Sequence, residues 1–201
     1  MLTKIKRHVA LESYPKFPLS NNLTEEFIYP KVVQTSILLI QAKSPKGHTK
    51  KLAYEIKRLC VSLNLTKLIF IGDTNRPWLY QQNTYKPANE AYIFLNENGI
   101  GKRFNGGLEI QVNDLEMFLY HFIWLTRCNA SLPYFYFADD RQNILGHICQ
   151  YGNFHIDLLN EKFNLNLSNA IVKTSFEYFT DSNCYNQFSN YSRLVGRKIM
   201  V

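Results

Sequence analysis

Two short apolar runs with an amphipathic segment between them constrain the fold most strongly. The runs, residues 36–42 and 67–72, are continuous and of strand length, which is typical of strands covered on both faces. Across residues 49–63, apolar side chains recur at helical spacing and the lysines fall on the opposite side. The order strand, helix, strand therefore predicts a parallel βαβ unit with a right-handed crossover.

An Asn-Gly pair predicts a hairpin farther along the chain. Residues 91–95 have the composition of a strand, and Asn98 and Gly99 supply the positive φ of a tight turn before a second strand at 100–104. A capped amphipathic helix at 113–127 follows. With the βαβ unit, these elements predict an α/β or α+β fold in which helices flank a central mixed sheet.

The C-terminal third predicts a second hairpin and a pair of helices. Residues 134–137 and 143–149 flank a polar turn and are rich in β-formers. Helices are expected at 154–163 and 169–179, each after a capping side chain. The pair has the form of a helical hairpin or a helix-turn-helix.

The length indicates a single core with attached segments. The chain has 201 residues, which is the size of one ordinary to large domain. We expect an N-terminal arm at 1–35, an α/β core at 36–128, and a hairpin and helical extension at 129–201 packed on that core. No apolar run is long enough to cross a bilayer, and the N-terminus lacks the apolar stretch of a signal peptide. We therefore expect a cytoplasmic protein without membrane insertion.

The order of elements over residues 36–124 resembles the thioredoxin-like fold. The resemblance rests on the run 92–99 and on the helix beginning at Asn113. That family has a redox CxxC between its first strand and helix, where residues 44–47 here are Ser-Pro-Lys-Gly, and a cis-proline before its third strand, where residues 90–91 are Glu-Ala. Without the two thiols, the dithiol exchange of the family does not carry over.

A basic segment and a polar loop are the predicted binding surface. Residues 43–58 contain six basic residues and one acidic residue, in a chain of net charge +7. In a βαβ unit, the loops 44–50 and 73–78 would meet at the carboxyl edge of the sheet, where open α/β sheets bind ligands. Exposed aromatic side chains in the second loop would act as interface anchors. The predicted binding residues are Lys46, His48, Lys50, Lys51, Asp73, Arg76, Trp78 and Tyr80.

The densest group of reactive side chains lies at residues 146–157. If 143–149 is a strand, His147 and Cys149 point to the same face, and His155 and Asp157 follow after a turn. A Cys-His nucleophile pair, or a metal site built from these four residues, is geometrically feasible. The four cysteines of the chain show no CxxC spacing, so we expect no metal and no cofactor.

These patterns favour a binding protein over an enzyme, because no catalytic or cofactor motif is complete. The first expectation is a non-catalytic protein that binds another protein, as an immunity, inhibitor or accessory protein of bacterial or phage origin does. The alternative is a cysteine-dependent enzyme that uses Cys149 with His147 or His155. A second alternative is nucleic-acid binding through residues 43–58, with Lys57 among the phosphate contacts.

Overall fold

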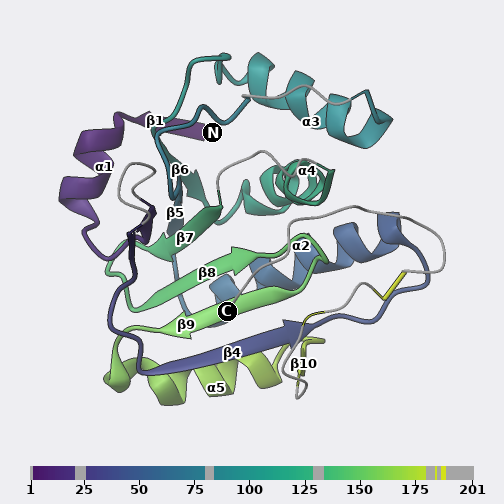
Figure 1. Cartoon of the computed structure of the whole chain (residues 1–201). Helices are drawn as coiled ribbons and strands as arrows, with labels where there is room; N and C mark the ends of the chain where they lie inside the picture. The colour runs from purple at the N-terminus through teal and green to yellow at the C-terminus, as the bar shows by residue number, and fades with distance from the viewer. Residues whose placement is uncertain are drawn as a thin grey trace.

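The protein has a mixed α/β fold built on one large antiparallel sheet (Figure 1). The structure is a computed structural model that describes residues 2–20, 26–79, 84–128, 134–179, 184 and 187–188. Eight strands pair in the order β1-β6-β5-β7-β8-β9-β4-β10, and β2 and β3 form a separate two-stranded ribbon. The strands are β1 (Leu2–Ile5), β2 (Leu19–Ser20), β3 (Phe27–Ile28), β4 (Gln34–Leu39), β5 (Lys67–Gly72), β6 (Gly107–Gln111), β7 (Phe135–Asp139), β8 (Ile144–Ile148), β9 (Phe154–Leu158) and β10 (Glu177–Tyr178).

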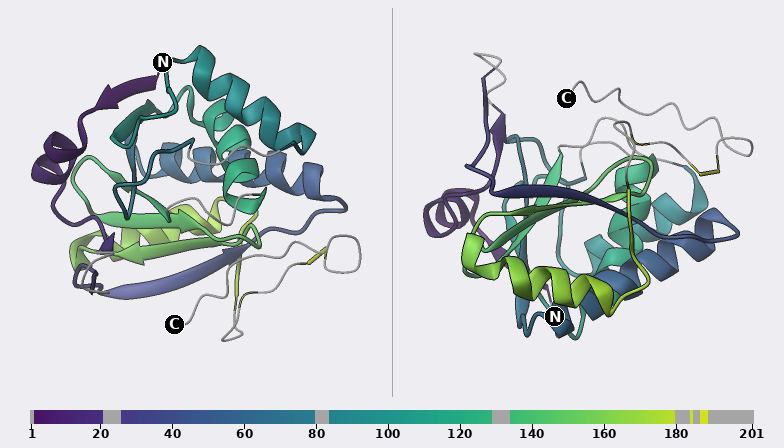
Figure 2. Two further views of the ribbon diagram at one scale, coloured as in Figure 1. Left: turned by 45° about the horizontal axis from the view of Figure 1, so that its top comes forward. Right: turned by 90° about the horizontal axis from the view of Figure 1, so that it is seen from below.

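The helices cover the two faces of this sheet unequally. Buried residues of α2, α3, α4 and α5 belong to one large apolar cluster, whereas Ala10 of α1 belongs to a smaller cluster on the other face. Figure 1 shows α1 on the left, away from α2, α3 and α4, and α5 at the bottom, and Figure 2 gives two further views of this arrangement. The helices are α1 (Arg7–Ser13), α2 (Pro45–Ser62), α3 (Lys86–Glu97), α4 (Leu115–Cys128) and α5 (Asn164–Val172), with a 3-10 turn at Glu161–Phe163.

Strand alternation explains how one sheet serves two cores. On β5, Leu68 and Phe70 point into the larger cluster, and Ile69 and Ile71 point into the smaller one. All four side chains are fully buried, so the continuous apolar run at 67–72 is confirmed as a strand covered on both faces. None of the helices in the described part of the chain is long and apolar enough to span a bilayer.

The strand, helix and strand of the predicted βαβ unit are present, but its two strands are not neighbours in the sheet. The strands β4 and β5 run in the same direction, because four successive antiparallel pairings separate them. However, β7, β8 and β9 lie between them, and every pairing in the sheet is antiparallel. The amphipathic helix itself is confirmed as α2, which begins earlier than expected because Ser44 caps it, accepting a hydrogen bond from Gly47 N at 3.1 Å, and Pro45 occupies its first turn.

The predicted hairpin at 91–104 is also wrong, because residues 86–97 form α3. Gly99 does adopt a positive φ of 77°, but it ends a helix. The N–H of Ile100 donates to Leu95 O, and that of Gly99 donates to Asn96 O, both at 2.9 Å. These two bonds are the Schellman ending of a helix. The resemblance to the thioredoxin-like fold used this hairpin, so the resemblance itself stays a prediction without that support.

The C-terminal third confirms one prediction and corrects another. The second hairpin forms as β7 and β8, with Phe137 opposite Gly146. Residues 154–158, expected to start a helix, form β9, which pairs with β8 and β4. The only described α-helix after them is α5, over Asn164–Val172, so the predicted helix pair is absent from the described residues. Phe154, Ile156 and Leu158 alternate into the larger core, which is a strand pattern of period two.

Candidate metal centre

A tight turn after β8 holds the first sulfur of the site. The N–H of Cys149 donates to Asn153 O at 3.0 Å, and the N–H of Gly152 donates to Cys149 O at 2.8 Å. Gly152 has φ of 84°, and a Cβ there would lie 2.8 Å from the His48 ring. Only glycine therefore fits this turn. The Cys149 sulfur, 1% exposed, accepts backbone hydrogen bonds from Asn153 and Tyr151.

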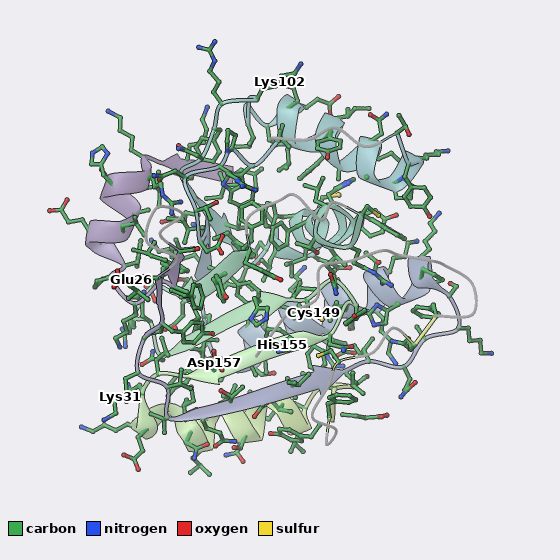
Figure 3. All side chains as sticks on the ribbon, in the orientation of Figure 1. Glu26, Lys31, Lys102, Cys149, His155 and Asp157 are labelled. Carbon is green, nitrogen blue, oxygen red and sulfur yellow. The ribbon has the colours of Figure 1, made fainter. Side chains whose placement is uncertain are left out.

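The second member, His155, is fixed by its place on β9. In the register of β8 and β9 it lies opposite His147. The two imidazole rings stack with centroids 4.3 Å apart and an 18° interplanar angle. Because Cys149 follows His147 by two residues, strand alternation puts the sulfur on the same side as both rings. Figure 3 shows Cys149 and His155 close together.

The third member, Cys184, comes from the C-terminal segment. Its sulfur lies 3.2 Å from Nε2 of His155. The donor atoms of Cys149, His155 and Cys184 all lie within 4.8 Å of one another. The same segment also contacts the protein through Gln187, whose Nε2 donates to Ile40 O at 3.0 Å. Two thiols and one imidazole from three separate parts of the chain thus converge.

The pKa values of the two thiols are shifted in opposite directions. Burial raises the pKa of Cys149 well above its usual value, and its hydrogen bond with Cys184 raises it further. The same hydrogen bond lowers the pKa of Cys184, and the hydrogen bond with His155 lowers it further despite partial burial. Of the two thiols, Cys184 is therefore the one that loses its proton more readily.

A buried cation and a neutral histidine lie beside this turn. Arg127 is 4% exposed, and its NH1 contacts Nδ1 of His48 at 3.3 Å. Burial lowers the pKa of His48 to about 4, and the charges of Arg127 and Lys51 lower it further. The ring of Phe188 packs edge-on against His48, with centroids 5.7 Å apart, so the C-terminal segment covers this pair.

The donor set fits a tetrahedral zinc ion. Bonds of about 2.3 Å to sulfur and about 2.0 Å to nitrogen place neighbouring donors about 3.5–3.8 Å apart. The 3.2 Å contact and the 4.8 Å limit of the cluster bracket that spacing. Two thiolates and one imidazole are ligands that select zinc over magnesium or calcium. Backbone N–H groups aimed at a sulfur also stabilise its thiolate form.

The predicted catalytic residues are only partly brought together. Cys149 and His155 converge, but their third partner is Cys184 instead of His147 or Asp157. His147 stacks on His155 and lies between it and Tyr136. Asp157 is 5% exposed and accepts a 2.5 Å hydrogen bond from the Tyr29 hydroxyl. Neither residue supplies a donor atom to the cluster, and only His147 contacts one of its members.

The predicted binding groove is not formed. The loop before α2 and the loop after β5 follow strands that have β7, β8 and β9 between them. Trp78, expected to be exposed, is 1% exposed and donates from Nε1 to Gly106 O at 2.9 Å. Asp73 is also buried and accepts a hydrogen bond from Tyr134 N. Arg76 is exposed, and Tyr80 lies outside the described residues.

Several basic side chains of the segment 43–58 already have partners within the protein, so fewer can contact a ligand than the composition suggests. Lys57 pairs with Glu116 at 3.5 Å, and Arg58 pairs with Glu55 at 3.1 Å. Lys51 donates to Gln41 O at 3.2 Å, and His48 is fully buried. Lys46 and Lys50 are exposed. Nucleic-acid binding through this segment stays a prediction.

Sequence reasoning missed Cys184 because no spacing rule connects it with Cys149. It lies 35 positions later, in a polar segment. Its only signal was the presence of a cysteine in an otherwise hydrophilic tail.

Comparison of the chain with protein-family models, curated proteins and solved structures finds no match.

Proposed function

We propose that this protein is a zinc-binding protein whose ion is held by Cys149, His155 and Cys184. The observation that carries the proposal is the convergence of these three donor atoms within 4.8 Å. A solvent molecule or a bound ligand would complete the four-coordinate shell, as in zinc sites with three protein ligands.

The charges of the site support a cation. Two sulfurs that each bind as thiolate repel one another, and Zn²⁺ cancels their combined charge. The buried Cys149 thiol would lose its proton on metal binding, so zinc affinity should fall as pH falls. The stacking of His155 on His147 at 4.3 Å would hold the imidazole ring in place.

The ion would also fasten the C-terminal segment to the sheet. Cys149 and His155 belong to the β8–β9 hairpin, whereas Cys184 lies beyond β10. Zinc would therefore close a loop of about 30 residues, and its binding would stabilise the folded chain by mass action, by about 4 kcal/mol at a free zinc concentration a thousand times the Kd.

Metal analysis of the full chain tests this proposal. We expect one zinc ion per chain after dialysis, and the loss of it in Cys184→Ser and in Cys149→Ser. The Co²⁺ form should show the thiolate-to-cobalt charge-transfer band of a two-sulfur site. Cys128→Ser is the matched control, because Cys128 is half-buried but lies outside the cluster. A folded wild-type protein that binds neither ion, or a Cys128→Ser variant that loses zinc as completely, would contradict the proposal.

A second candidate is thiol chemistry at Cys184. The contact of its sulfur with Nε2 of His155 at 3.2 Å is the geometry of an activated nucleophile. This changes the predicted nucleophile of the cysteine-enzyme alternative from the buried Cys149 to the half-buried Cys184. In metal-free, folded protein, iodoacetamide should modify Cys184 before Cys128 near neutral pH. Modification of Cys149 first would argue against it.

Binding of another protein remains a prediction. Exposed apolar side chains on and after β3 give it some support, since Phe27, Ile28 and Val33 are 51%, 60% and 46% exposed. Recovery of a stoichiometric partner by the wild type, but not by Ile28→Glu, is the expected result.

A further inference from the structure

A pocket at the start of the chain is lined by positive charge. It has a volume of about 470 Å³ and lies between residues 4–8 and 103–106. The residues that line it include Lys4, Lys6, Arg7, His8 and Arg103, and none of them is acidic. This volume lies within the range of small-molecule sites. The pocket shares no residue with the metal centre or with the segment 43–58.

The pocket walls are held in place before any ligand binds. NH1 of Arg7 donates to Gly72 O at 2.9 Å and to Asn105 O at 3.4 Å, so two carbonyls fix the guanidinium. Lys4 Nζ donates to Gly99 O at 3.0 Å. Both cations are thus positioned by neutral acceptors, so their charges are not cancelled at these contacts.

The opposite wall is equally well anchored. The carbonyl of Gly106 accepts from the buried Trp78 indole at 2.9 Å, and the carbonyl of Phe104 accepts from Trp78 N at 2.8 Å. A Cβ at Gly106 would overlap the Ile5 carbonyl, which shows how closely this loop packs against β1. A preorganised wall loses little entropy on binding. Trp78, predicted to contact a partner, instead supports this wall from within the core.

The remaining cations have no competing partner. In the described part of the chain, the side chains of Lys6 and Arg103 form no hydrogen bond and no ion pair, and both residues are exposed. One carboxylate, that of Asp73, interacts electrostatically with Arg7, but Asp73 does not line the pocket. The pocket therefore presents a net positive charge to a ligand.

We propose that this pocket binds a di- or triphosphate chain, as carried by nucleotides or by inorganic polyphosphate. Lys4, Lys6, Arg7 and Arg103 are four permanent cations around one concavity, and guanidinium and ammonium groups are the usual partners of phosphate oxygens. A long nucleic acid would need an extended basic track, whereas these charges surround a single open concavity.

Calorimetric titration of the full protein tests the proposal at low ionic strength. The probes are inorganic tripolyphosphate, ATP and adenosine, without magnesium. Tripolyphosphate and ATP should bind and adenosine should not. Tighter binding of ATP than of tripolyphosphate identifies a nucleotide as the source of the phosphates, and equal binding identifies the phosphate chain alone. Failure of both phosphates to bind would overturn the proposal.

Two double variants with the same change in net charge test whether tripolyphosphate binding depends on the cations of the pocket or on the overall charge of the protein. Lys6→Glu combined with Arg103→Glu should weaken tripolyphosphate binding by about tenfold or more, because each cation lies within contact range of the phosphates. Lys31→Glu combined with Lys162→Glu makes the same change in charge, and both sites are exposed and outside the pocket lining. Circular dichroism checks the fold of both variants. Equal loss in both pairs, or a single-stranded oligonucleotide that binds more tightly than tripolyphosphate, would overturn the proposal.

Discussion

The two faces of the sheet differ in what they bury. The face toward α2–α5 is almost entirely apolar and aromatic, with Phe70 in contact with the rings of Phe118, Phe122 and Phe137. The other face has a small apolar cluster at the β5–β7 end and polar side chains at the β8–β9 end, where His147, His155 and Asp157 lie. Apolar packing is thus concentrated on one face, and Cys149 and His155 of the candidate metal centre lie on the other.

Truncation of a buried side chain should lower the free energy of unfolding much more on the face toward α2–α5 than on the other face. Phe70→Ala should lower the free energy of unfolding by about 4 kcal/mol, because it opens a cavity among fully buried rings. His147→Ala should cost only about 1 kcal/mol, since the half-buried imidazole has stacking contacts on Tyr136 and His155 to lose. Urea unfolding of metal-free protein measures both values. Similar losses would contradict the contrast between the faces.

Acid should destabilise the protein through His48, a neutral group on the apolar side. Its pKa of about 4 in the folded state lies below the value of about 6.5 in an unfolded chain. The unfolded chain therefore binds the proton first, so the stabilisation is complete above pH 6.5 and is lost as pH falls toward 4. The loss approaches about 3 kcal/mol.

His48→Asn isolates this contribution, because the amide oxygen can replace Nδ1 beside Arg127. The slope of unfolding free energy against pH should become shallower between pH 6.5 and 4. His147 has a pKa lowered in the same direction by burial and by His155, so part of the slope should persist. An unchanged slope in the variant would show that His48 is not the titrating group.

The smallest effect is expected at the polar end of the sheet. Tyr29→Phe removes the 2.5 Å hydrogen bond to the buried Asp157 carboxylate and keeps the ring. The expected cost is about 1–2 kcal/mol, typical of a bond to a charged group. Phe27→Leu is a control on the same segment, since Phe27 is 51% exposed and should change the stability little. Thermal unfolding that shows no difference between the two variants would mean that this bond contributes nothing.

Several elements could be read directly from the sequence because their signals are local. The strand at 67–72, the helix at 113–127 and the hairpin around residues 139–142 all formed as predicted. Each depends on hydrophobic periodicity or on turn residues within about 15 positions. The α/β class follows from these elements alone.

Local sequence patterns predicted the wrong element where the same pattern is compatible with two structures. The positive φ of Gly99 ends a helix as readily as it closes a hairpin, and the packing of Ala91 and Leu95 against the core decides between the two structures. The segment 154–158 alternates polar and apolar residues, yet its capping Asn153 suggested a helix. Its pairing with both β8 and β4 made it a strand.

By itself, the sequence determined the class of fold, the α2 and α4 helices and the presence of reactive side chains around Cys149. Only the tertiary structure decided which strands are neighbours and which side chains meet. Strand order depends on contacts between residues far apart in the chain, and the hydrophobic periodicity of the sequence does not reveal these contacts. For this reason β4 and β5 have three strands between them instead of being adjacent. For the same reason Cys184, 35 positions beyond Cys149, completes a cluster that the sequence placed with His147 and Asp157.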